Sequence, residues 1–217
     1  MHRRSPNWGR ALFLSLWTVG LGALGAMAPG LLPAPGWAVA VVILALALSI
    51  AVGVLSQRCG FYARPLTHIP GAGNRLALTF DDGPDEEFSP RVLELLRAAG
   101  QRATFFVIAD RVARHPELTR RIVAEGHELG NHSTRHPWHL ALWTAAGVCR
   151  EVRAAQAVIE RVAGVSPRLF RPPAAVLSPQ VERGARLAGL ELVGYSVRSG
   201  DGSPLVPSAL ALIVVRW

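Results

Sequence analysis

The stretch Leu76-Ala-Leu-Thr-Phe-Asp-Asp-Gly-Pro84 leads an apolar strand into two adjacent carboxylates at a Gly-Pro turn. Farther along the chain, His132-Ser-Thr-Arg-His136 supplies two histidines with three residues between them. One carboxylate and two imidazoles, with a further position left open for water, form the ligand set of a catalytic zinc centre. The two motifs together therefore predict a metal site, and the second carboxylate is free to act as a base.

Each motif has a simpler interpretation when it is taken alone. An Asp-Asp-Gly-Pro-Asp turn is commonly a solvated loop or the start of a helix. Two histidines at this spacing are commonly surface or capping residues. However, both motifs follow predicted strands in a chain that alternates strand and helix, and such folds place their chemistry at strand ends. This shared position favours a functional site.

Strand and helix patterns alternate from residue 76 onwards. Strands are predicted at 76–80, 103–108, 127–131, 168–170, 190–197 and 209–215. Helices are predicted from Ser89-Pro90 to Gly100, across a break at His115-Pro116 to Glu125, from Thr144 to Ala163, and from Ser178-Pro179 to Gly189. Helices of this length between strands imply parallel pairing and right-handed crossovers. We therefore expect an α/β fold of the barrel type.

The N-terminal part of the chain is apolar and uncharged. Residues 11–57 contain no Asp, Glu, Lys or Arg. Within them, residues 11–28 and 37–55 are each long enough to cross a hydrocarbon core, and Pro29–Gly36 between them predicts a tight turn. Neither segment has the polar face expected of a helix on the surface of a soluble core. The predicted organisation is a two-helix transmembrane hairpin at 1–57, a linker at 58–74 and an α/β domain at 75–217.

The arginines that flank the hairpin predict its orientation. Three of them precede the first segment, and Arg58, Arg64 and Arg75 follow the second. Because two spans return the chain to its starting side, and basic residues favour the cytoplasm, we expect the α/β domain on the cytoplasmic side of a bacterial inner membrane. An extracytoplasmic domain stays open. The basic N-terminus and Ala26-Met-Ala28 also fit a cleaved secretory signal, in which case the second segment would still anchor the chain.

Charge and cysteine content exclude some classes of function. The chain has 23 basic and 15 acidic residues, and every basic residue is Arg. These arginines are scattered among the acids of amphipathic helices without an aromatic-interleaved groove, so nucleic-acid binding is not expected. A modest positive balance suits anionic membrane lipid instead. Cys59 and Cys149 have neither CxxC nor metal-site spacing and are expected to be free thiols.

Three motifs occur in order along the α/β domain: Thr79-Phe-Asp-Asp-Gly-Pro84, Gly126-His-Glu-Leu-Gly-Asn-His-Ser-Thr-Arg-His136 and Arg171-Pro-Pro173. Together they resemble the first three motifs of the NodB-homology polysaccharide deacetylases, carbohydrate esterase family 4. The resemblance implies a distorted (β/α) barrel that removes N- or O-acetyl groups from a polysaccharide, an oligosaccharide or a lipid-linked amino sugar. It also implies a divalent metal, commonly Zn²⁺, although a site of this kind accepts Co²⁺, Ni²⁺ or Mn²⁺ as well.

The resemblance assigns roles to the residues of the first two motifs. Asp82, His132 and His136 would hold the metal, and Asp81 would be the base that deprotonates water. Neighbouring residues of an extended segment point in opposite directions, which is consistent with separate roles for the two aspartates.

Residues later in the chain would support this base and the transition state. The resemblance implies that Arg171 pairs with Asp81, and that Asp201 is the fourth-motif acid that orients Arg171. Ala174 occupies the position whose backbone N–H contributes to the oxyanion hole, where the family has a Tyr. Four neighbouring polar residues are expected to be structural: His115, His127, Asn131 and His139.

The chain departs from the family at its C-terminal end. The fifth motif of the family is an apolar strand that ends in Leu-His, and this His protonates the leaving amine. Here the sequence reads Leu212-Ile-Val-Val-Arg-Trp217 instead, so we expect the barrel to be incomplete at the C-terminus. Two functions stay open: a membrane-anchored deacetylase, or a catalytically impaired relative that keeps the metal site and binds sugar or a partner.

Overall fold

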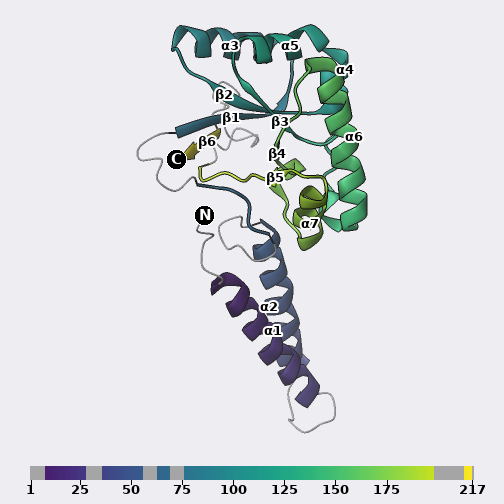
Figure 1. The fold of residues 1–217 in the computed structure, drawn as a ribbon. Coiled ribbons are helices and arrows are strands. Elements are labelled where there is room, and N and C mark those ends of the chain that lie inside the picture. The colour runs from purple at the N-terminus through teal and green to yellow at the C-terminus, as the bar shows by residue number, and fades with distance from the viewer. Residues whose placement is uncertain (1–7, 28–35, 56–62, 69–75, 198–212, 217) are drawn as a thin grey trace.

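The computed structural model describes residues 8–27, 36–55, 63–68, 76–197 and 213–216 (Figure 1). A pair of helices stands at the N-terminal end, and an α/β domain built on a six-stranded sheet follows it. The predicted linker at 58–74 is described only at 63–68, where Leu66 forms a parallel bridge with Val193.

The N-terminal helices are α1 (Trp8–Met27) and α2 (Gly36–Leu55). They occupy the two apolar segments predicted to be helical, and a hydrogen bond from Trp17 Nε1 to Ser49 Oγ at 3.1 Å joins them. Within the described residues there is no helix whose length and apolar character would allow it to cross a membrane.

Among the described residues, the sheet contains five parallel strands and one antiparallel strand. The strands are β1 (Leu76–Gly83), β2 (Ala103–Val107), β3 (Glu128–Asn131), β4 (Leu169–Phe170), β5 (Glu191–Leu192) and β6 (Ile213–Arg216), in the order β5-β4-β3-β2-β1-β6. Strands β1 to β5 pair in parallel, and β6 pairs antiparallel with β1. The antiparallel direction of β6 differs from the parallel pairing that the sequence pattern predicts.

In the described part of the domain, the α-helices that connect or flank these strands are α3 (Phe88–Ala98), α4 (Ala109–Arg114), α5 (Pro116–Ala124), α6 (Ala145–Ala163) and α7 (Pro179–Leu187). From β1 to β5 the strand order runs in one direction and never reverses. Right-handed crossovers then place successive helices on the same face of the sheet, as in (β/α) barrels and unlike doubly wound sheets. In Figure 1, α3 and α5 lie above the strands, and α4 and α6 stand to their right. The α/β fold is confirmed, whereas closure into a barrel stays a prediction, because β5 and β6 end the order of the described strands.

Two element boundaries differ from the predicted ones for local reasons. Helix α3 begins at Phe88, because the Asp85 carboxylate accepts hydrogen bonds from the Glu87 and Phe88 N–H groups at 3.0 and 2.9 Å. Strand β5 is much shorter than the predicted 190–197. Beyond Leu192, the carbonyl of Gly194 accepts from Arg171 Nη2, and its N–H donates to the Leu66 carbonyl at the isolated bridge between Leu66 and Val193.

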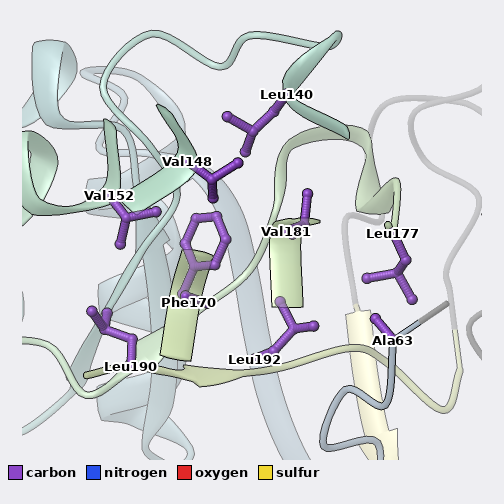
Figure 2. Packing of buried hydrophobic residues seen from close by; sticks show 10 residues of the cluster. Ala63, Leu140, Val148, Val152, Phe170, Leu177, Val181, Leu190 and Leu192 are labelled. Carbon is purple, nitrogen blue, oxygen red and sulfur yellow. The ribbon is translucent and has the colours of Figure 1, made fainter. Parts of the chain in front are cut away.

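The core beside β4 and β5 is shown in Figure 2. The Phe170 ring lies among Val148 and Val152 of α6 and Val181 of α7, and all four side chains are fully buried. A second cluster, around Phe105, packs α3, α5 and α6 against β1, β2 and β3. These two clusters fix the carboxyl ends of β1, β3 and β4, where the predicted site residues stand. Cys149 is buried and free, whereas Cys59 lies outside the described residues.

Candidate functional site

The three predicted ligands meet at the carboxyl ends of β1 and β3. Asp82 belongs to β1, and His132 directly follows β3. His132 Nε2 lies 3.5 Å from Asp82 Oδ1, and His136 Nε2 lies 3.4 Å from the same oxygen. A tetrahedral zinc ion with ligand distances of about 2.1 Å separates its ligand atoms by about 3.4 Å. The three side chains therefore fit one metal ion of this size.

Hydrogen bonding defines which nitrogen of His132 faces the site. Its Nδ1 lies 2.7 Å from the backbone carbonyl oxygen of Arg171, and His132 is only 2% exposed. A carbonyl oxygen can only accept, so Nδ1 carries the proton. The lone pair of the neutral ring is then at Nε2, which points to the other two ligands. A backbone partner of this kind commonly orients a metal-binding histidine.

Two of the three predicted ligands have a strained backbone. Asp82 has a φ of 64° and His136 a φ of 58°, in the left-handed region that side chains with a Cβ seldom occupy. Such strain costs about 1–3 kcal/mol per residue and occurs preferentially at functional sites. At this turn the two adjacent carboxylates contact different residues. Asp82 faces His132 and His136, and Asp81 contacts Arg171.

The electrostatics of the cluster favour the protonation states that bind metal. The pKa of Asp82 lies below its ordinary value, chiefly because a protonated His132 ring can donate a hydrogen bond to it, with help from the charges of His136 and Arg111 and against the effect of burial. The pKa of His136 is also lowered, chiefly by burial, although the Asp82 charge acts in the opposite direction. An ionised carboxylate and a neutral imidazole are the forms that coordinate a cation.

Asp81 is held by a buried arginine beside this cluster. Arg171 has no exposed surface, and its Nη1 donates to Asp81 Oδ1 at 2.6 Å and to Thr79 Oγ1 at 2.9 Å. Its Nη2 donates to the Gly194 carbonyl at 2.9 Å, and its guanidinium carbon lies 4.0 Å above the ring centre of Phe106. Removing one partner of a buried ion pair typically costs about 3–5 kcal/mol. The predicted Asp81–Arg171 pair is therefore present and firmly positioned.

Two other predicted site residues stand apart from this geometry. Ala174 lies in the short helix η3 (Pro173–Ala175), with an exposed position and a left-handed φ of 52°. Asp201 lies outside the described residues. The roles predicted for both stay predictions.

The polar residues that we expected to be structural have structural partners. Asn131 Oδ1 accepts from the Ser133 N–H at 2.9 Å and Nδ2 donates to the Val152 carbonyl, so the residue ties the His132 loop to α6. The partners of the three histidines are the Ala103 N–H for His127 Nδ1, the Glu86 carboxylate for His115, and the rings of Trp138 and Trp143 for His139.

Sequence reasoning missed the arginines next to the ligand cluster. Arg111 Nη1 donates to the backbone carbonyl of Asp82 at 2.7 Å. Together with Arg114 and Arg135, it lines a cavity that also contacts the side chains of Asp82 and His136. We treated these arginines as scattered helix charges. Their position directly after β2 and inside the H-x3-H motif is the signal that would have located them at the same sheet edge.

Comparison with known proteins agrees with these motifs. Residues 68–193 match the family model described as polysaccharide deacetylase. A peptidoglycan-N-acetylglucosamine deacetylase from Bacillus cereus is 34% identical over 126 residues, which cover 58% of this chain and 46% of that protein. A chitooligosaccharide deacetylase from a Bradyrhizobium strain is 41% identical over 142 residues, which cover 63% of this chain and 64% of that protein.

A solved structure shows a similar fold. It is that of a family 4 acetyl xylan esterase from Clostridium thermocellum in complex with a cobalt ion, with a TM-score of 0.55 at 35% identity. The match covers 61% of this chain and 62% of that structure. The chain thus spans less than two thirds of each of these three relatives.

Proposed function

Because this chain belongs to the polysaccharide deacetylase family, we propose that it hydrolyses acetyl groups from an acetylated carbohydrate with the aid of one divalent metal ion. One observation carries the proposal. The ligand cluster of Asp82, His132 and His136 stands beside a carboxylate, Asp81, that a buried arginine holds in place. The site thus combines a cation-binding set with a separate, oriented base.

The proposed ligands are Asp82 Oδ1 and the Nε2 atoms of the two histidines. A bound Zn²⁺ would polarise the acyl carbonyl and lower the pKa of a water molecule. The same donors accept Co²⁺, Ni²⁺ and Mn²⁺, and the relative from Clostridium thermocellum contains cobalt.

The other residues of the proposed site act on protons and charge. Asp81 accepts the proton of the attacking water, since its carboxylate is oriented beside the cluster without belonging to it. Arg171 directs this carboxylate by donating to one of its oxygens. The Ala174 N–H is the proposed donor to the oxyanion, and Asp201 the proposed partner of the arginine.

The proposed substrate is an acetylated amino sugar. The two curated relatives described above act on peptidoglycan N-acetylglucosamine and on chitooligosaccharide, and both reactions cleave an acetamide. Hydrolysis of this bond adds water across the C–N bond and yields acetate and a free amine.

We further propose that the uncharged N-terminal region, with its apolar segments at 11–28 and 37–55, anchors the chain in a bacterial inner membrane through contact with membrane lipid. The uncharged stretch at 11–57 and the arginines on either side of it support this proposal. The same charge bias favours a cytoplasmic α/β domain, in which case lipid-linked or oligosaccharide precursors would be within reach.

The proposed function can be tested on the purified full-length chain. We expect one zinc ion per chain and release of acetate from N-acetylated chito-oligosaccharides. His132→Ala should lose both the metal and the activity, because it removes a buried ligand. His68→Ala, which changes an exposed histidine outside the cluster, should keep both.

Two results would contradict parts of this proposal. Metal retained at the wild-type level in His132→Ala would reject the ligand assignment. Stoichiometric metal without acetate release from any acetylated sugar would instead favour the second function, a relative that binds sugar or a partner without catalysis.

A further inference from the structure

A cavity of about 400 Å³ adjoins the ligand cluster. Two of its walls are proposed ligands, Asp82 and His136, so it opens directly beside the metal position. The other lining residues are Ile108, Asp110, Arg111, Arg114 and Arg135. Neither Asp81 nor Arg171 contributes to the lining, so the cavity is separate from the proposed base.

The charges of this cavity are unbalanced. Three guanidinium groups face two carboxylates, and one carboxylate, Asp110, is already paired with Arg135 at 2.9 Å. The other is the proposed metal ligand Asp82. Within the described part of the chain, Arg111 and Arg114 form no salt bridge, and each donates to a backbone carbonyl instead, those of Asp82 and Asp110.

These hydrogen bonds hold the two arginines beside the cavity. Arg111 uses one Nη atom for the Asp82 carbonyl at 2.7 Å, and Arg114 uses Nε for the Asp110 carbonyl at 3.2 Å. Each guanidinium has five N–H donors, so several remain for a ligand. Because guanidinium groups match the paired oxygens of carboxylate and phosphate, the free donors select for an anion.

We propose that this cavity binds an anionic group, a carboxylate or a phosphate, carried by the acetylated sugar close to the acetyl group that is removed. The inference rests on the proposed function, because it treats the adjoining cluster as the reaction centre. It narrows the substrate class from any acetylated amino sugar to one with an acidic substituent. A neutral chitin-like sugar would leave the donors of Arg111 and Arg114 to water.

Equilibrium binding tests the proposal without relying on turnover. The protein is the zinc-loaded full-length chain carrying Asp81→Asn, which keeps each sugar intact. The probes are N-acetylglucosamine, N-acetylmuramic acid and N-acetylglucosamine 6-phosphate, which carry no charge, a carboxylate and a phosphate. We expect at least one anionic sugar to bind roughly tenfold more tightly than the neutral one, as for a charge-assisted hydrogen bond.

Matched variants test whether the cavity causes the tighter binding of the anionic sugar. Arg114→Gln should abolish the preference for the anionic sugar, and Arg114→Lys should restore part of it. Asp110→Asn, which removes the carboxylate paired with Arg135, should increase it. Arg97→Gln removes the same charge from the exposed face of α3, outside the cavity, and should leave the preference unchanged.

The outcomes separate the sources of the anion. Preference for the muramic acid alone identifies a carboxylate, and preference for the phosphate ester alone identifies a phosphate. Equal affinity for all three sugars would overturn the proposal. A preference that survives Arg114→Gln would overturn it as well, since the anion would then be binding the metal ion itself.

A failure of this inference is distinguishable from a failure of the proposed function. Acetate release by the wild-type chain without any charge preference would contradict only the anion site. Charge-dependent binding that needs Arg114, combined with no acetate release, would support the anion site and contradict only the deacetylase activity.

Discussion

Asp81 and Asp82 are adjacent carboxylates with different surroundings. Asp81 accepts from the buried Arg171 guanidinium, whereas Asp82 faces the two histidines. Asp82 has a left-handed backbone with a φ of 64°, so the separation arises at a turn and not from the simple alternation of an extended strand that the sequence pattern predicts. The two positions therefore predict two different mutant phenotypes.

Asp81→Asn is expected to keep the metal and lose activity. The amide cannot accept a proton from water, and loss of general-base help typically lowers a rate by about a hundred- to ten-thousand-fold. Asp82→Asn should lose metal and activity together. Metal analysis and acetate release on both variants check this, and equal loss of metal from the two would refute the division of roles.

Because His127 is buried, we expect the free energy of unfolding to depend on pH. Its pKa is lowered from 6.5, chiefly by burial, with Arg102 acting in the same direction and Glu125 against it. The unfolded chain therefore takes up this proton at a higher pH than the folded chain. The contribution of His127 to stability is complete above about pH 6.5 and is lost as the pH falls from there towards the lower folded pKa.

Chemical unfolding at several pH values checks this expectation. On going from about pH 7.5 to about pH 5, the wild type should lose more free energy of unfolding than His127→Gln, by up to about 1.4 kcal/mol per pH unit. In the wild type, the Ala103 N–H donates a hydrogen bond to His127 Nδ1 at 3.3 Å. The side-chain oxygen of a glutamine can still accept this bond. Parallel pH profiles for the two proteins would contradict the assignment.

The residues of the candidate site could be named from the sequence because its strongest signals are local. The proposed ligands and Asp81 lie in short motifs, and their proximity follows from the parallel order of β1, β2 and β3. The surroundings of Arg171 were not predictable in the same way. Its partners Thr79 and Gly194 are distant in sequence, and without the fold nothing indicates that a fully buried guanidinium joins them.

At the scale of elements, helix ends were more predictable than strand pairing. Helix α6 begins after Thr144, whose Oγ1 accepts from the Gly147 N–H, and ends at the left-handed Gly164. Helix α7 has Ser178 as its cap, accepting from the Val181 N–H. These signals lie within one turn of the helix end. The length of β5 and the direction of β6 depend on partners elsewhere in the chain, so apolar pattern alone did not define them.

Gly184 predicts how closely α6 and α7 must pack. A Cβ at this position would lie 2.5 Å from Val148 Cβ and 2.9 Å from the Ala145 carbonyl oxygen. An alanine normally stabilises a helix interior by about 1 kcal/mol relative to glycine. Here the overlap involves backbone and a branched side chain in a full core, and overpacking of this kind costs about 1–3 kcal/mol.

Gly184→Ala is therefore expected to be destabilising by up to about 2 kcal/mol after the gain in helix propensity is subtracted. The measurement is the free energy of unfolding of the full-length chain in denaturant. Arg183→Ala, at the exposed neighbouring position of the same helix, should change it by less than about 0.5 kcal/mol. A stabilising effect of Gly184→Ala would mean that the two helices can move apart without loss.

At the scale of the whole molecule, the two parts of the chain have different compositions. Residues 11–57 carry no charged side chain, whereas the α/β domain mixes arginine and acidic residues over its surface. Two spans at the predicted segments, residues 11–28 and 37–55, would return the chain to the side where it began. The arginines on both flanks favour the cytoplasm as that side.

Reporter fusions at Asn74 and at Trp217 test this topology. A cytoplasmic reporter should be active at both positions, because the predicted hairpin ends before Asn74 and the α/β domain contains no further apolar segment of spanning length. Alkaline phosphatase, which needs export, should be inactive at both. The opposite pattern would mean that only one apolar segment spans and that the domain is external. A cytoplasmic result would direct the search for substrate to lipid-linked or oligosaccharide precursors, whereas an external result would direct it to the acetylated polymer of the cell wall.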